Sequence, residues 1–428
     1  MTESTPSVQK PRPEKAPISV FVILCSIWSG LVITEGISAS ILPLTIKGFT
    51  NDPFVIGLIL ALNPFFGFIA QPLVGILGDR IWTPLGRRAF FLIVGAPMVA
   101  FCLVLIPETR IFWFFVVLVV IYQFSQDILW GSDHPLLADL VPPRQRILAN
   151  ALILTSSQVV SFFFLKKGMG WLLAVAGDDL GAEILYYIAA FAQVLLVAGA
   201  AFFLKEKRPE VSERPRLTPL RYFKDFFGDR ILRKFGFPAF FQAFFFSVIT
   251  TFVVLFAVES VGLTTSDFGN SWSILPLLSL FLAIPMGLAV EKYLPKQWAL
   301  VAGYGLGLAG CAFGYFAADG NDLTILAVAF GFGMLICNLT QKPFFTEFIP
   351  RDIIGQVAGT YNICFAVGRT LAAAGGGYLI KLLGNDYRMI FPIAFGAGVT
   401  ATVLAMTLRD PRFQAERLAR KAATARVG

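Results

Sequence analysis

Long apolar runs follow one another along the whole chain, separated by short polar segments. A run of about twenty apolar residues forms a helix long enough to cross the hydrocarbon core of a bilayer. The pattern therefore predicts an all-α membrane protein with about twelve transmembrane helices. The predicted spans are residues 18–46, 54–78, 89–107, 110–134, 147–175, 183–204, 235–258, 266–290, 298–318, 322–345, 354–381 and 386–408.

Positive charge is distributed unevenly between the two sides that these runs define. If both termini are cytoplasmic, the inner loops and tails hold 28 of the 35 Lys and Arg residues, and the outer segments hold six. Short cytoplasmic loops carry an excess of Lys and Arg in membrane proteins. The charge distribution thus predicts a multi-pass protein with both termini in the cytoplasm, in the inner membrane if the source is bacterial.

Two short motifs occur twice, once in each half of the chain. Gly75–Arg80 after the second run is echoed by Gly287–Lys292 after the eighth, and Pro135–Pro142 after the fourth is echoed by Pro343–Pro350 after the tenth. The two offsets, 212 and 208 residues, nearly agree. We therefore expect two six-helix halves related by an internal repeat, the architecture of alternating-access carriers.

This repeat divides the chain into five segments. The central one has Leu217, Leu220, Phe223, Phe227 and Ile231 at helical spacing among basic residues, which is typical of an amphipathic helix on a membrane surface. A plain linker is an equally good interpretation. The expected segments are an N-terminal tail (1–17), a first half (18–204), a central cytoplasmic loop (205–234), a second half (235–408) and a basic tail (409–428).

Composition excludes most soluble functions. Of the 428 residues 56% are hydrophobic and 14% charged, whereas about 25% charged residues is usual in soluble domains. The net charge of +8 lies in loops and tails, so it does not indicate nucleic-acid binding. One His cannot build a metal site, the five Cys fall inside apolar runs, and a P-loop is absent from the sequence. We expect no enzyme activity, cofactor or metal.

Three charged residues stand out near the middle of apolar runs: Glu35, Asp127 and Arg369. A charge at mid-membrane costs about 2.5–3.5 kcal/mol on insertion scales, so it is seldom present without a partner or a purpose. In the functional interpretation the carboxylates bind a proton and solute hydroxyls, with Arg369 as counter-charge. In the structural alternative, Arg369 pairs permanently with one acid and locks two helices. For Asp133 and His134, at the end of the fourth run, we expect loop gating or solvation.

The loop after the second run carries the most recognisable motif. Gly75–Arg80, with the pattern Gly-x-Leu-x-Asp-Arg, precedes Gly86–Arg88. This pattern resembles the loop between helices 2 and 3 of the major facilitator superfamily. The five residues between the two parts, and Gln71–Gly75 ahead of them, are similar to sucrose carriers and to the glycoside-pentoside-hexuronide cation symporters. Leu136–Leu140, followed by Arg146, matches the loop that those carriers have after helix 4.

The resemblance implies a monomeric secondary transporter that moves sucrose, maltose or another glucoside together with a proton across the bilayer. It also implies a central cavity. The expected proton and substrate ligands are Glu35, Asp127, Arg369, Gln123, Gln158, Gln242 and Asn338, the amides having interhelical hydrogen bonds as their commoner role. The expected gating residues are Asp79, Arg80, Gly86, Arg87, Arg88, Asp139, Glu291 and Glu347.

One position departs from the family pattern. The helix-4 acid of the sucrose carriers falls on Gln123, which cannot take up a proton, so we expect Asp127, one turn further in, to substitute. Melibiose-type relatives use helix-2 acids for sodium, and the second run here has none, which favours a proton. Two alternatives stay open: a carrier for a non-sugar solute, and a non-transporting assembly or sensor protein on the same scaffold.

Overall fold

The computed structural model describes residues 16–80, 82–133, 135–204, 206, 230–346 and 354–408, and throughout them the chain is helical with short connections. The first half comprises α1 (Ile18–Gly36), η1 (Ile37–Ile41), α2 (Leu42–Phe49), α3 (Pro53–Leu60), α4 (Leu62–Arg80), α5 (Ala89–Glu108), α6 (Phe112–Asp133), α7 (Leu136–Leu140), η2 (Pro143–Gln145), α8 (Arg146–Phe163), η3 (Phe164–Leu172), α9 (Leu173–Ala176), α10 (Asp178–Ala192), η4 (Gln193–Gly199) and α11 (Ala200–Phe202).

The second half follows after the central segment. It comprises α13 (Arg230–Leu255), η5 (Phe256–Val261), α14 (Thr265–Trp272), α15 (Ile274–Tyr293), α16 (Lys296–Tyr315), α17 (Gly320–Thr346), α18 (Ile354–Leu382), η6 (Tyr387–Met389) and α19 (Ile390–Thr407). The expected tails and most of the central loop lie outside the described residues. Residues 230–234, which the sequence assigned to that loop, are the first residues of α13.

Eleven helical stretches of the described chain are long and apolar enough to cross a membrane. The ninth predicted span corresponds to α16, a helix of 20 residues that is not among those eleven. Large apolar side chains also cover the outside of the bundle: Trp113 is 74% exposed and Phe281 is 67% exposed. Such a surface is unfavourable in water and suits lipid. The prediction of an all-α membrane fold is confirmed.

Four of the spans contain a stretch of π-helix, which the apolar pattern does not reveal. These stretches are η1, η3, η4 and η5. A π turn holds one residue more than an α turn and occurs often at functional sites. Here η1 begins two residues after Glu35, so the residues that follow it are turned relative to a regular helix.

Small residues allow the helices of the second half to pack closely. The carbonyl oxygen of Gly333 on α17 would lie 3.0 Å from a Cβ placed on Gly303 of α16, which leaves no room for a side chain there. Gly307 likewise faces the rings of α13, whereas Gly305 has open space around it. Two of the three glycines in this segment of α16 therefore allow close helix packing.

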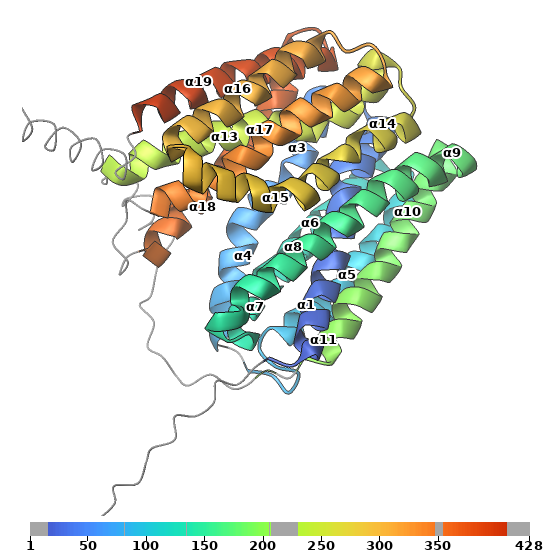
Figure 1. Ribbon diagram of the computed structural model, residues 1–428. Coiled ribbons are helices and arrows are strands. Elements are labelled where there is room, and N and C mark those ends of the chain that lie inside the picture. Colours follow the sequence, from blue (N-terminus) through green and yellow to red (C-terminus); the bar gives the residue numbers. More distant parts are fainter. Residues whose placement is uncertain are drawn as a thin grey trace, which may run out of the picture.

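The two halves meet at one end of the molecule. There α3 of the first half lies against α18 of the second, so closely that a Cβ on Gly57 would collide with the Ala373 carbonyl and one on Gly377 with the Pro53 carbonyl. At the same end the Ser266 hydroxyl of α14 donates to the Gly170 carbonyl of η3. Figure 1 shows these elements at the top of the view, where the two bundles come together.

Candidate functional site

A polar cluster within the first half gathers most of the predicted ligands. The Nδ2 atom of Asn63, on α4, donates to Glu35 Oε2 at 3.4 Å and to Gln123 Oε1 at 3.1 Å. Glu35 comes from α1 and Gln123 from α6, so one amide joins three helices. Glu35 and Asn63 are half-buried, and Gln123 is buried.

The hydrogen bonds continue from Gln123 toward the π turn of the first span. Gln123 Nε2 donates to Ser38 Oγ at 3.4 Å, and Ser38 lies 2.7 Å from the Tyr122 hydroxyl. That hydroxyl donates to the Thr34 carbonyl at 2.8 Å, so Ser38 donates to Tyr122. Every member of this chain therefore has a fixed donor direction, in which Glu35 is an acceptor.

Asp127 sits beside this chain with only half of its carboxylate used. Gln71 Nε2, on α4, donates to Asp127 Oδ1 at 2.9 Å. Oδ2 is buried and has no hydrogen-bond partner, and the residue as a whole is 4% exposed. Leaving a carboxylate oxygen buried and unpaired is costly unless a proton or a ligand donor reaches it.

The spacing of the two amides on α4 explains why one helix serves both acids. Asn63 and Gln71 are eight residues apart, just over two helical turns, and so lie on nearly the same face. Glycine at position 67 between them brings its Cα close to the carboxylate, because a Cβ there would lie 3.1 Å from Asp127 Oδ1. α4 thus presents a narrow face that holds both carboxylates.

A further amide pair behind the site was missed by the sequence analysis. Gln126 Nε2 donates to Thr34 Oγ1 at 2.6 Å, and Gln193 Nε2 on η4 donates to Gln126 Oε1 at 3.4 Å. Both glutamines are buried. The available signal was a glutamine in the middle of an apolar run, which seldom stays there without a hydrogen-bond partner.

Arg369 lies on α18 of the opposite half and is half-buried. It belongs to the charged groups that act electrostatically on Asp127, together with Glu35. Within the described chain, however, no ion pair within 4.0 Å joins Arg369 to either acid. The permanent pair of the structural alternative is therefore absent from this conformation.

The remaining predicted ligands lie apart from this cluster. In the second half Tyr304 donates its hydroxyl proton to Gln242 Oε1 at 2.7 Å, and Gln242 Nε2 is 3.4 Å from Asn338 Oδ1. This matches the interhelical role that amides most often have. Gln158 is half-buried on α8.

The predicted gating residues form a charged cluster where α5 begins. Arg87 Nη2 and Arg88 Nε both bind Asp139 Oδ2, at 2.6 and 2.7 Å. Gly86 has a φ of +105°, which suits glycine and lets the chain turn into α5. The side chains of Asp79 and Arg80, and the whole of Glu347, lie outside what the structure describes, while Glu291 is exposed at the end of α15.

Glu206 completes this cluster, although the sequence did not single it out. Its carboxylate accepts the backbone N–H groups of Arg87, Arg88 and Ala89, the last at 2.7 Å. These N–H groups lie at and just before the start of α5, where an acid complements the helix dipole. The chain after the sixth span is thereby fastened to the loop after the second, and none of these contacts reaches the second half.

Ion pairs between the halves occur at the opposite end. Lys47 Nζ lies 3.0 Å from Glu259 Oε2, and Lys381 Nζ lies 2.5 Å from Asp52 Oδ2. The hydrogen bond from Lys381 holds the pKa of Asp52 below its usual value. We call these four residues the latch. They join the halves where α3 and α18 are in contact.

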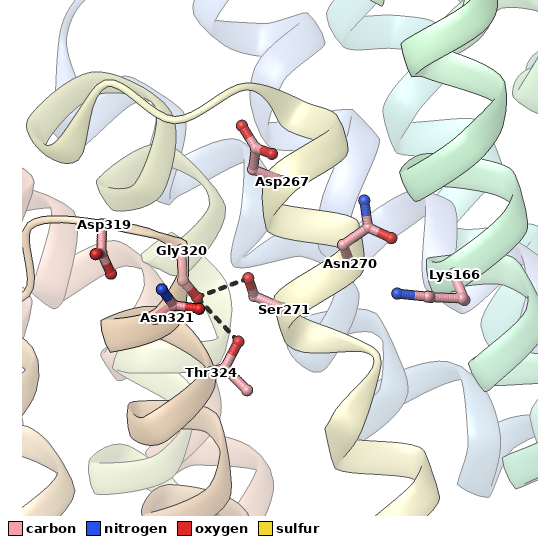
Figure 2. Close-up of a pocket in the computed structure, with 8 residues that line it drawn as sticks. All are labelled: Lys166, Asp267, Asn270, Ser271, Asp319, Gly320, Asn321 and Thr324. Atoms are coloured by element: carbon pink, nitrogen blue, oxygen red, sulfur yellow. Dashed lines mark hydrogen bonds between the residues drawn. The ribbon is translucent and has the colours of Figure 1, made fainter.

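A polar cavity of about 380 Å³ opens between η3 and the second half. Figure 2 shows Asp267, Asn270 and Ser271 of α14 in the middle, Lys166 of η3 on the right and the start of α17 with Asn321 and Thr324 on the left. The Ser271 hydroxyl is already bonded to the Gly320 carbonyl at 2.9 Å, and Asp267 caps its own helix. Because its polar groups serve the local fold, this cavity is not the candidate site.

Asp133 contradicts the expectation of solvation at the end of α6. It is 1% exposed, and neither carboxylate oxygen has a hydrogen-bond partner. The Trp28 indole lies beside it and meets Trp130 edge-on, with ring centroids 5.1 Å apart. His134 lies outside the described residues.

Comparison with known proteins agrees with this architecture. The family model of the Major Facilitator Superfamily matches residues 23–373. A sucrose transport protein of Arabidopsis thaliana, SUC3, is 25% identical over 153 residues, which are 31% of this chain and 26% of that protein. The match therefore spans about a quarter of the relative's length.

Solved structures resemble the fold over nearly its whole length. The nucleoside transporter NupG superposes with a TM-score of 0.71 at 12% identity, covering 91% of this chain and 98% of that one. A POT family transporter in complex with a thioalcohol-conjugated peptide gives 0.69 at 13% identity, with 91% and 95% covered. A bacterial homologue of the lysosomal transporter Spinster, inward-facing and occupied, gives 0.65 at 14% identity, with 91% and 92% covered. At these identities the likeness concerns the fold alone.

Proposed function

Because this chain belongs to the major facilitator superfamily, we propose that it transports a sugar (a disaccharide or a glucoside) together with a proton. Transport takes place by alternating access. Membership of this superfamily makes the chain a multi-pass integral membrane protein and a secondary carrier of small molecules. Its members are transporters, not enzymes. The solute and the coupling ion are the proposal.

The pair of carboxylates on one face of α4 is the observation that carries it. Glu35 accepts from Asn63 and Asp127 from Gln71, so amides fix both acids while leaving acceptor capacity unused. Carboxylates accept hydrogen bonds from sugar hydroxyls well, and a buried unpaired oxygen such as Asp127 Oδ2 suits a proton. Gln123 is occupied by Asn63 and Ser38, which supports Asp127 as the substitute for the helix-4 acid.

The described cross-half ion pairs indicate which side is closed. All of them lie in the latch, whereas the cluster of Arg87, Arg88, Asp139 and Glu206 makes no ion pair to the second half among the described residues. With both termini cytoplasmic, the latch faces outward. The conformation is then closed to the outside, and Arg369 stands apart from both acids as expected once the proton and the solute have bound.

In the cycle that follows, Arg369 approaches a deprotonated acid in the outward-facing state. Such a pair resists separation of the halves because an unpaired buried charge is costly. Proton and sugar together replace Arg369 at the acid and allow the halves to rock toward the cytoplasm. Coupling arises because only the two ligands together favour the inward-facing state.

Sugar is favoured over other solutes by the loop motif and by the match to a sucrose transport protein. Uptake of a panel of radiolabelled disaccharides into proteoliposomes, with and without an imposed pH gradient, tests both parts of the proposal. We expect one disaccharide or glucoside to accumulate when the outside is acidic. A nucleoside or a peptide accumulating in its place would overturn the sugar, and accumulation that follows a sodium gradient would overturn the proton.

The matched variants are Asp127→Asn and Glu35→Gln, with Asp178→Asn, an exposed acid at the start of α10, as control. Asp127→Asn mimics the protonated acid, so exchange of solute should persist while accumulation driven by the pH gradient is lost. If both variants still concentrate the solute at the control's rate, proton coupling through these acids is wrong.

A further inference from the structure

Asp133 is the most completely buried acid that the proposed cycle does not use. It ends α6, six residues beyond Asp127, or about 9 Å further along the helix at 1.5 Å per residue. Its exposure is 1%, and it lies among the residues at the end of the bundle where the loop cluster is found.

Both of its oxygens are without a hydrogen-bond partner. The Trp28 indole stands beside it, and with Trp130 it supplies an aromatic wall. An ionised carboxylate in this place would have almost no water around it and no ion-pair partner among the described side chains, a cost of several kcal/mol for an unpaired buried charge. A bound proton removes that cost and requires no other ligand.

The elements packed against this end of α6 are α1, α4, α5 and α7. No ion pair within 4.0 Å joins Asp133 to any group whose side chain is described, and Arg87 and Arg88 instead bind Asp139. The side chains of Asp79, Arg80 and His134 lie outside the description. The other titratable or charged groups of these elements are Cys25, Glu35, Cys102, Glu108, Arg88 and Asp139.

We propose that Asp133 is a second proton-binding carboxyl on α6, loaded from the cytoplasmic side and distinct from Asp127. A metal ion fits the place poorly, because the described residues contain no group of three His, Cys, Asp or Glu that could hold one. The side from which the proton enters rests on the orientation in the proposed function; the proton site itself does not.

The sign of the pH effect follows from the burial. With the proton bound, the end of α6 is neutral and the present conformation is favoured. Raising the cytoplasmic pH removes the proton and leaves a charge buried without a partner, so the protein should shift toward a conformation in which Asp133 is hydrated or paired. High internal pH should therefore slow the re-formation of the inward-facing state from the outward-facing one.

Infrared difference spectroscopy on the full-length purified protein at neutral and alkaline pH tests the proton directly. The carbonyl stretch of protonated carboxyl groups should lose one component in Asp133→Asn and a different one in Asp127→Asn. The exposed Asp178→Asn should lose none at neutral pH, and His134→Gln should leave the carboxyl band intact. Sodium chloride at constant pH should not change the Asp133 component.

An unchanged carboxyl band in Asp133→Asn overturns the proposal, and so does a component that sodium removes. Neither result touches the proposed function, which is decided by solute uptake in Asp127→Asn. Conversely, a missing Asp133 component in a protein that accumulates no sugar leaves the proton site in place and overturns only the solute. If Asp133→Asn fails to fold, Asp133→Cys and Asp133→Leu give the same spectral comparison.

Discussion

At the scale of single residues, one amide decides how the site is held. Asn63 bridges Glu35 and Gln123 through the same nitrogen, and Gln71 holds Asp127. The sequence revealed the acids, because charges inside apolar runs are conspicuous. It could not reveal which amides serve them, since each amide lies on a different helix from the acid that it holds. Asp133 was wrongly expected to be solvated for the same reason: its place near a loop says nothing about the Trp28 side chain that covers it.

Replacing Asn63 by Leu should weaken solute binding without unfolding the protein. The change removes two hydrogen bonds and leaves Gln123 Oε1 without its donor, and an unsatisfied buried group costs about 1–3 kcal/mol. We expect affinity to fall about tenfold, the equivalent of 1.4 kcal/mol. Calorimetric titration with the transported sugar measures it. Asn362→Leu, an exposed amide on α18, is the matched control, and equal losses in both would contradict a specific role for Asn63.

At the scale of helices, apolar length predicted nearly every span. The four π stretches escaped prediction, because an extra residue in one turn leaves composition and run length unchanged. The contact between α3 and α18 escaped for another reason. Gly57 and Gly377 belong to different halves, and only the folded chain shows that each needs the other to be small.

Gly377→Ala should open the latch end of the molecule. Its Cβ would strike the Pro53 carbonyl, which is backbone and cannot turn aside. Gly375→Ala, on the same helix with nothing within 4 Å, should have no effect. Spin labels at the exposed Asp179 and Asn321 report the distance between the halves at this end. The distance distribution should lengthen in Gly377→Ala alone; an unchanged distribution would mean that the helices absorb the methyl group.

At the scale of the whole molecule, the halves are fastened by pairs that no local pattern marks. Asp52 and Lys381 are 329 residues apart, and each looks like an ordinary loop or helix-end charge in the sequence. The internal repeat predicted that two halves exist and that charge lies at their ends. It could not predict which end is closed, because both arrangements use the same sequence.

Charge exchange tests the latch. Lys381 lowers the pKa of Asp52, so the attraction is complete at neutral pH and is lost only as pH falls through that lowered pKa, below the usual value of about 3.9. Transport assays run at about pH 5 to 8, and over that range Asp52 should remain ionised. Lys381→Asp should lengthen the same spin-label distance, and adding Asp52→Lys should restore it. Failure of the double variant to restore the distance would show that the pair does not hold the halves.

The π turn of the first span also governs how this chain can be compared with others. A relative that lacks the extra residue in Ile37–Ile41 can keep a regular helix there, with Glu35 on one side and Leu42–Phe49 on the other still facing the same neighbours. A one-residue gap at the exposed Ala39 would therefore be neutral for the fold, whereas the same gap in α3 would rotate every later side chain by about 100°. Alignments that forbid gaps inside membrane helices would displace Glu35 by one position and pair it with the wrong residue.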